Sequence, residues 1–430
     1  MKIQKSKFLV LFIALLLILS NVFIFIQKVD KTSVMARYTN RVPLRQLGFI
    51  GYTLYDTKSY LDRHFKVTTQ DDIDTTNNIL NRFEENLTSL KTTSNKNVIL
   101  VQLESLDGVA LDINLEDGPL MPNLKKISES SIYFPNAYDL SGSGRTTDGE
   151  ILATSSILPI QNENIFTSYD LSHLVTLPKV LKENGYSTFS IHGFEGSFYG
   201  RNIAHPAMGY DNSYFLENLN DDDVVGWGVS DKSMITQAVG IMKEQTTPFM
   251  AHLITLTNHH PYDHINKSLG NDTSDIVNNY YASVRYLDES IGLLFDQLEK
   301  SNLLDNSIVI FFSDHDSSIT KLIHERNNLP YDNTLKDDRI VLVAYTKDEV
   351  SVNLSLAAQL TVAPLVLNKL GLPIPKNMLG QKTFDGVDGL LMQNGTFVSL
   401  DAFNNFVYTN TSINMYDFTQ TLIYKGDDLN

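Results

Sequence analysis

The sequence predicts an α/β fold in which a mostly parallel central sheet is flanked by helices on both faces. Short apolar runs that suit buried strands recur along the chain, helical patterns lie between them, and polar residues follow directly where several runs end. The predicted strands are 98–103, 187–191, 249–255, 308–312 and 340–344.

Helices are predicted between the strands and before the first one. The expected ranges are 47–63, 72–90, 177–183 and 276–298. Acidic residues at 71, 72 and 74 mark a helix start, because carboxylates are favourable near a helix N-terminus. Gly185 suits the end of the helix at 177–183, and Asn394-Gly395 predicts a hairpin turn near the C-terminus.

The composition excludes several kinds of site and partner. The 430 residues contain no cysteine, so disulfides, thiolate metal sites and a cysteine nucleophile are excluded. The formal net charge of -16 argues against a nucleic-acid partner and gives no attraction toward an anionic membrane surface. Contact with a membrane therefore requires an apolar anchor.

The N-terminal segment has the features of such an anchor. Residues 8–26 are almost entirely apolar, and as a helix they would span about 28 Å, close to the hydrocarbon thickness of a bilayer. Three lysines precede this run and favour a cytoplasmic N-terminus, with the remaining chain outside the cell. The alternative is a signal peptide cleaved after Ala36, but Ala36 lies far beyond the apolar run, which favours a retained single-pass anchor.

The chain divides into four expected parts. These are a cytoplasmic tip and transmembrane anchor at 1–27, an extracellular helical linker at 28–95, an α/β domain at 96–385 and a small α+β appendage at 386–430.

Acidic and imidazole side chains follow two of the predicted strands. Glu104 comes after the strand at 98–103, and Asp314 and His315 come after the strand at 308–312. Because the carboxyl ends of parallel strands meet at one edge of a sheet, these side chains are expected to lie together and could bind a divalent cation. The alternatives are a helix N-terminus for Glu104 and a loop hydrogen bond for the other two.

A hydroxyl and two histidines lie in loops at the same expected edge. Thr146 follows a glycine-rich turn and opens a helical stretch, so it is either an N-cap or a nucleophile for phosphoryl transfer. His259 and His260 follow the strand at 249–255. They suit acid–base or phosphate-binding roles, with burial in a hydrogen-bonded loop as the alternative.

The strand at 187–191 leads into another group of candidates. His192 ends this strand, and Tyr199 and Arg201 follow in the next loop. Arginine suits phosphate because its planar guanidinium can donate to two oxygens at once. For Tyr199 the alternative is packing.

Four motifs together resemble the extracellular domain of the lipoteichoic acid synthases, sulfatase-fold phosphoglycerol transferases of the alkaline phosphatase superfamily. The motifs are QLES at 102–105, GRTTD at 144–148, TNHHP at 257–261 and SDH at 313–315. The resemblance extends from residue 48 to residue 398. It implies that one Mn²⁺ or Mg²⁺ ion is bound by Glu104, Thr146, Asp314 and His315.

The resemblance also implies roles in substrate binding and catalysis. Thr146 would be the nucleophile and His259 would assist proton transfer, while Arg201 and Tyr199, the latter in place of the family's tryptophan, would hold glycerol phosphate. His192 and His260 are further expected substrate contacts. The donor would be phosphatidylglycerol or a related phospholipid, and the acceptor a teichoic acid, a glycolipid or a polysaccharide.

The sequence departs from the family pattern in three places. The best-known members have five transmembrane helices, a glycine-rich loop after the metal-binding histidine and a lysine before the nucleophile. This sequence has one predicted span, Asp316-Ser317-Ser318 and Arg145 instead. A phosphoethanolamine transferase, a metal-dependent phosphodiesterase of the same superfamily and a non-catalytic anchored binding protein are the alternatives.

Overall fold

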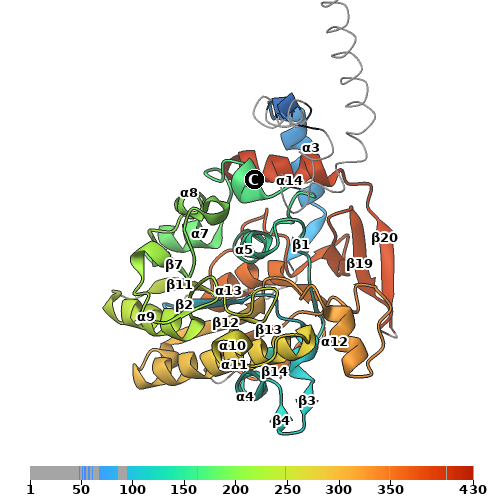
Figure 1. The fold of residues 1–430 in the computed structure, drawn as a ribbon. Helices are drawn as coiled ribbons and strands as arrows, with labels where there is room; N and C mark the ends of the chain where they lie inside the picture. Colours follow the sequence, from blue (N-terminus) through green and yellow to red (C-terminus); the bar gives the residue numbers. More distant parts are fainter. Residues whose placement is uncertain are drawn as a thin grey trace, which may run out of the picture. The chain divides into compact units, whose positions relative to one another are not determined.

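The computed structural model describes residues 67–85, 94–161, 163–246, 248–347, 349–402 and 404–429, with single positions between 48 and 61. Its centre is an eight-stranded sheet (Figure 1). In spatial order the strands are β14 (Ser351–Val352), β5 (Ile132–Tyr133), β13 (Leu342–Thr346), β12 (Ser307–Ser313), β2 (Asn97–Leu103), β11 (Phe249–Ile254), β7 (Ser187–His192) and β8 (Asn212–Tyr214).

Five neighbouring strands, from β12 to β8, run parallel, and four of the five predicted strands are among them. The fifth prediction, at 340–344, is two residues early, and the strand found there, β13, runs antiparallel to β12. The sheet is therefore mixed. An apolar run shows that a strand is buried but carries no information about its direction.

Helices cover both faces of the sheet (Figure 1). Successive residues of β2 point to opposite faces and join different cores. Val98 and Leu100 belong to one apolar core, and Ile99 and Val101 belong to the other. The first core includes α5 (Thr146–Ser155), α7 (Leu177–Glu183) and α13 (Val362–Leu370), and the second includes α4 (Pro122–Glu129), α9 (Asp231–Glu244) and α11 (Ile276–Lys300).

The helices predicted at 177–183 and 276–298 are confirmed as α7 and α11. The helix predicted at 72–90 starts as expected, because Thr69 and Asp72 form a capping box, but α3 (Gln70–Leu80) ends early. The chain then forms β1 (Phe83–Glu85), which pairs with β16 (Lys382–Phe384). Between 47 and 63 the single described positions are helical, and the rest of that prediction lies outside the described residues.

The predicted hairpin at Asn394-Gly395 joins β18 (Leu390–Leu391) to β19 (Thr396–Leu400), and β20 (Phe406–Asn410) completes a small antiparallel sheet. The last helix, α14 (Met415–Lys425), lies against α3. No helix in the described part of the chain is long and apolar enough to cross a bilayer. The anchor predicted at 8–26 lies outside the described residues.

Candidate metal centre and nucleophile

Strands β2 and β12 end side by side, which brings Glu104 to Asp314 and His315. The backbone N–H of Asp314 donates to the carbonyl oxygen of Leu103 at 3.1 Å, so the pairing continues to the end of both strands. Ser105 then leaves β2 with φ +50°, and its N–H donates to Oδ1 of Asp314 at 2.8 Å. The sheet register thus fixes both carboxylates.

Glu104, Asp314 and His315 form the one group of three acidic or imidazole side chains, within the described ranges, whose ligand atoms lie within 4.8 Å of one another. Nε2 of His315 is 3.7 Å from Oε1 of Glu104 and 3.6 Å from Oδ2 of Asp314. All three side chains are buried, and Oδ2 of Asp314 has no hydrogen-bond partner among the described residues. A buried carboxylate oxygen without a partner costs free energy, and a bound cation would remove that cost.

The two carboxyl groups oppose each other's ionisation. Burial and the nearby charge of Glu104 raise the pKa of Asp314 well above its ordinary value. Burial also works against ionisation of Glu104, but the charges of His259 and His315 and a hydrogen bond from Ser105 hold its pKa below the ordinary value. Two carboxylates with one imidazole and no thiolate fit a hard or borderline divalent cation, whose charge would let both carboxyl groups ionise.

The hydroxyl of Thr146 lies at the first position of α5 and donates to Oε2 of Glu104 at 3.2 Å. Arg145 precedes it with φ +50°, a strained conformation for a residue with a side chain, and its guanidinium pairs with Asp316 at 3.0 Å. Asp148 accepts two backbone N–H groups of the glycine-rich turn, at 2.8 and 2.9 Å. These contacts hold the start of α5 beside the carboxylates.

Gly149 allows α5 to approach the end of β12 closely. A Cβ atom at this position would lie 2.8 Å from the Cα and the carbonyl oxygen of Asp314, which is closer than real Cβ contacts allow. The absence of a side chain therefore allows Thr146, one turn earlier in the helix, to lie beside Glu104, Asp314 and His315, the candidate metal-binding group.

A buried polar chain supports the backbone of Thr146. Nε2 of Gln102 donates to the carbonyl oxygen of Thr146 at 3.0 Å, and Oε1 of Gln102 accepts from Nε2 of His252 at 3.1 Å. Nδ1 of His252 then accepts from the hydroxyl of Tyr210 at 2.7 Å. The amide oxygen of Gln102 can only accept, so Nε2 of His252 carries the proton in this contact. Burial lowers the pKa of His252 to about 3, so the ring is neutral and its Nδ1 is free to accept from Tyr210.

Glu150 connects α5 to α8 (Arg201–Ala207). Its Oε1 accepts from Nε of Arg201 at 2.8 Å, and its Oε2 lies 2.7 Å from Nε2 of His205. Burial opposes ionisation of Glu150, yet the charge of Arg201 and the contact with His205 lower its pKa to about 2. Arg201 is only 1 % exposed, and its guanidinium links α8 to α5 through the ion pair with Glu150.

Three of the predicted histidines are oriented in the same way. Nδ1 of each lies at hydrogen-bond distance from a backbone carbonyl oxygen, which can only accept, so Nδ1 carries the proton and Nε2 is left for a ligand or a second proton. The pairs are His192 with Ile254 at 3.0 Å, His259 with His260 at 2.8 Å, and His315 with Asp316 at 2.7 Å.

The remaining predicted residues lie around this group. The Tyr199 ring is 37 % exposed, and its centroid lies 5.9 Å from the Arg201 guanidinium carbon. Burial and the Arg201 charge lower the pKa of His192 to about 3. His260 is exposed at the surface, where its ring packs edge-on against Tyr262 at 5.5 Å.

Sequence reasoning gave no role to Trp227, whose ring centroid lies 4.1 Å from that of His259. Trp227 occupies the turn between β9 (Val224–Val225) and β10 (Gly228–Val229). No sequence motif includes Trp227, and its distance from His259 along the chain gave no reason to expect a contact between the two rings.

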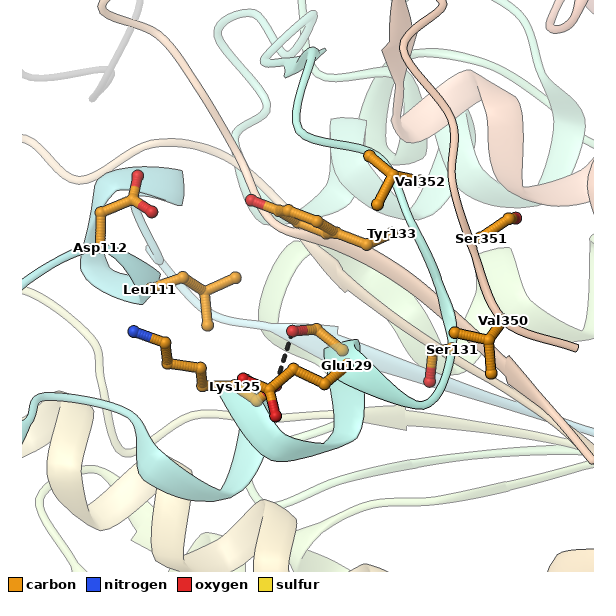
Figure 2. Close-up of a pocket in the computed structure, with 10 residues that line it drawn as sticks. Leu111, Asp112, Lys125, Glu129, Ser131, Tyr133, Val350, Ser351 and Val352 are labelled. Carbon is orange, nitrogen blue, oxygen red and sulfur yellow. Dashed lines mark hydrogen bonds between the residues drawn. The ribbon is translucent and has the colours of Figure 1, made fainter.

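A separate pocket of about 300 Å³ lies at the β14 edge of the sheet, where α4 forms one side and Val350 and Val352 lie on the other (Figure 2). Two strands, β12 and β13, separate β5 in this region from β2. Glu104, Asp314 and His315 are not among the residues that line this pocket.

Comparison with known proteins shows which sequences this chain resembles. The sequence is 26 % identical over 405 residues to lipoteichoic acid synthase 1 of Bacillus subtilis (strain 168), a match that covers 88 % of this chain and 63 % of that protein. The predicted likeness to the lipoteichoic acid synthases is confirmed. The chain spans less than two thirds of the length of the curated relatives it matches.

Two solved structures share the fold. The lipoteichoic acid synthase LtaP from Listeria monocytogenes aligns with a TM-score of 0.68 and 22 % identity, over 83 % of this chain and 97 % of that one. A protein in the alkaline phosphatase superfamily from Vibrio parahaemolyticus aligns with a TM-score of 0.62 and 20 % identity, over 86 % and 97 %. The family model described as Sulfatase matches residues 96–371, from the start of β2 to the end of α13, and the chain therefore belongs to the sulfatase family.

Proposed function

We propose that this protein is a membrane-anchored extracellular phosphoglycerol transferase. It would move glycerol phosphate from phosphatidylglycerol, through a threonine-linked intermediate, to a teichoic acid or another cell-surface glycan. The observation that carries this proposal is the hydroxyl of Thr146, which lies at a helix N-terminus and donates to Glu104 within the buried metal-binding group. The names of the related synthases support it. The segment at 8–26 would hold the site near its lipid donor.

In the first step, Oγ1 of Thr146 attacks the phosphorus of the donor and the bond between phosphorus and the diacylglycerol oxygen breaks. The threonine proton passes by way of Glu104 to that oxygen, and diacylglycerol leaves. The hydrogen bond to Glu104 directs the hydroxyl proton toward a carboxylate. Thr146 lies at the N-terminus of α5, and the positive end of the helix dipole there would stabilise the developing negative charge. Glu104, Thr146, Asp314 and His315 would hold one Mn²⁺ or Mg²⁺ ion. When bound, this ion would supply Lewis-acid stabilisation of the hydroxyl oxygen and the phosphoryl group.

In the second step, an acceptor hydroxyl attacks the phosphorus, the bond between phosphorus and Oγ1 of Thr146 breaks, and the acceptor proton ends on the threonine oxygen. Nε2 of His259 is not needed for the hydrogen bond to His260, so it can take the acceptor proton. His192 and Arg201 would orient the phosphoryl oxygens, Arg201 through the N–H groups that Glu150 does not use. Tyr199 and His260 would contact the rest of the substrate.

Intact-mass measurement of the full chain in detergent, after incubation with phosphatidylglycerol and Mn²⁺, tests this proposal. We expect a glycerophosphoryl adduct on the wild type, none on Thr146→Ala, and a slower adduct on Thr146→Ser, which keeps a hydroxyl. Release of glycerol phosphate without an adduct would instead identify a hydrolase. An adduct that forms only from phosphatidylethanolamine would identify a phosphoethanolamine transferase.

A further inference from the structure

The loop after His315 gathers oxygen atoms that the proposed function does not use. The hydroxyl of Thr320 lies at the centre of this oxygen group. It is 2.6 Å from Oδ1 of Asp107, 3.3 Å from Oδ2 of Asp316 and 3.0 Å from the carbonyl oxygen of Ser317. A hydroxyl has one proton to donate, so three acceptors converge here on a single hydrogen.

Asp107 adds a buried carboxylate oxygen to this group. The residue is 1 % exposed, and its Oδ2 makes no hydrogen bond to the described part of the chain. Its Oδ1 accepts from Thr320 and, at 3.4 Å, from the N–H of Ser317. Because both oxygens are bonded to one carbon, Oδ2 lies next to the atom that Thr320 contacts. A buried carboxylate oxygen without a partner costs free energy, and a bound cation would remove that cost.

Further carboxylates surround the oxygen group. Oδ2 of Asp139 accepts from the N–H of Asp316 at 3.1 Å, and the N–H of Asp139 donates to the carbonyl oxygen of Asp338 at 2.9 Å. Burial and the charges of neighbouring carboxylates, of which Asp139 has the largest effect, raise the pKa of Asp338 to about 6. Arg145 offsets one of these charges through its ion pair with Asp316. The remaining carboxylates give the group a surplus of negative charge, which a cation would neutralise.

The donor atoms of the oxygen group indicate which cation it would bind. Two carboxylates, a carbonyl and a hydroxyl, with no imidazole or thiolate, suit a hard cation such as Ca²⁺ or Mg²⁺. Mg²⁺ requires a near-ideal octahedron and retains several water molecules, whereas Ca²⁺ accepts irregular sets of oxygen ligands. The donors here come from two separate loops, one after β2 and one that leads into α12 (Thr320–Arg326), which favours the more adaptable Ca²⁺.

We propose that a Ca²⁺ ion binds at this oxygen group, as a second site beside the candidate metal-binding group. Its ligands are the carboxylates of Asp107 and Asp316, the hydroxyl of Thr320 and the carbonyl oxygen of Ser317. Oδ1 of Asp316 pairs with Arg145, which precedes Thr146 and has a strained φ of +50°. The ion would therefore fix Asp316 and, through it, the residue next to the candidate nucleophile. This site does not depend on which reaction the protein catalyses.

Calorimetric titration of the full chain in detergent with CaCl₂ tests this site. Glu104→Gln removes a carboxylate from the candidate metal-binding group and serves as the background, so Ca²⁺ binding that remains in it indicates a second site. We expect this background to bind one Ca²⁺ ion with a dissociation constant of about 0.1–1 mM. Adding Asp107→Asn or Thr320→Val should weaken binding by about tenfold or more, because each removes a ligand. Adding Asp221→Asn, at an exposed aspartate, should leave it unchanged.

Melting temperatures in the same background separate loss of a ligand from damage to the fold. In a chelator, adding Asp107→Asn should leave the melting temperature unchanged or raise it, because the substitution removes a buried charge. With Ca²⁺ added, the background should gain stability and the Asp107→Asn chain should not.

Two results would overturn the inference. If the background bound no Ca²⁺, Oδ2 of Asp107 would be satisfied by water alone. If Asp107→Asn lowered the melting temperature equally with Ca²⁺ and with the chelator, the carboxylate would act on the fold and not as a ligand. Neither result would bear on formation of the glycerophosphoryl adduct, which tests the proposed function separately.

Discussion

Gln102, inside the central strand β2, donates a hydrogen bond of 3.0 Å to the backbone carbonyl oxygen of Thr146. The same amide accepts from His252 on the neighbouring strand. A buried side chain of the sheet therefore fixes the backbone of the candidate nucleophile, and this fixed position is independent of the metal-binding side chains. The contact leads to a prediction about catalytic geometry.

Replacing Gln102 with leucine leaves Nε2 of His252 without its partner and removes the side-chain hydrogen bond to the carbonyl oxygen of Thr146. We therefore expect a loss of about 1–3 kcal/mol in the free energy of unfolding. Turnover should fall by at least tenfold with little change in KM, because the hydroxyl of Thr146 loses its exact placement. Urea denaturation and steady-state kinetics measure the two effects. The matching change at an exposed glutamine at the start of α3, Gln70→Leu, should alter neither. Unchanged turnover in Gln102→Leu would rule out the positioning role.

Bound cation should raise the melting temperature of the wild type. Ligand at about one hundred times its dissociation constant adds about 2.7 kcal/mol to the free energy of unfolding. We expect Mn²⁺ to produce this shift and a chelator to reverse it, while Glu104→Gln and Asp314→Asn should abolish it. Asp316→Asn changes the next carboxylate in the chain, which pairs with Arg145, and should keep the shift. If Asp316→Asn alone abolished it, the ligand set would be different.

The ion pair between Glu150 and Arg201 should make stability depend on pH in acid. The pKa of Glu150 falls from 4.5 to about 2 on folding, so its contribution is complete above pH 4.5 and disappears as the pH falls toward 2. The expected size is about 3 kcal/mol. The groups that face this carboxylate are Arg201 and His205 from α8 and His252 from β11.

Denaturation of wild type and Glu150→Gln at a series of pH values tests this prediction. The wild type should be more stable than the variant at pH 6, and the difference should shrink between pH 4.5 and 2. A constant difference across that window would show that the carboxylate charge does not contribute.

The close approach of α5 to β12 predicts opposite effects for two glycine substitutions. At Gly149 a methyl group would collide with the backbone of Asp314, so Gly149→Ala should cost about 1–3 kcal/mol and weaken Mn²⁺ binding. At Gly240, exposed on α9, nothing lies within 4 Å, and Gly240→Ala should stabilise the protein by about 1 kcal/mol. Melting curves with and without Mn²⁺ distinguish the outcomes, and normal Mn²⁺ binding by Gly149→Ala would contradict the proposed constraint.

The sequence predicted the candidate site wherever an apolar run that forms a strand was followed directly by a side chain that can bind a ligand. An apolar run followed at once by Glu104, and another followed by Asp314 and His315, predict two strands and the meeting of their ends. The structure contains both strands and brings the three side chains together. The direction of β13 could not be predicted, because burial on both faces gives parallel and antiparallel strands the same composition.

These patterns could not predict contacts between polar residues that are far apart in the sequence. Gln102 and His252 lie within runs that otherwise suit strands, where a polar residue shows no preference for one partner over another. The stacking of Trp227 on His259 depends on a two-stranded hairpin too short to produce a periodic signal. Sequence patterns therefore predicted that Glu104, Asp314 and His315 lie together, but not the side chains that support them.

The parallel pairing of β2 with β12 also determines when the site can exist. Ser105 and Asp314, which share a hydrogen bond beside the metal-binding group, are separated by 209 positions in the chain. Contacts of such long range form slowly, because the entropy cost of closing a large loop comes before the contacts can stabilise the fold. During synthesis, Glu104 and Thr146 emerge long before their partners, so a partly made or partly folded chain has no complete cation site. Cation binding at this site would therefore require the finished sheet, and it would report completion of folding.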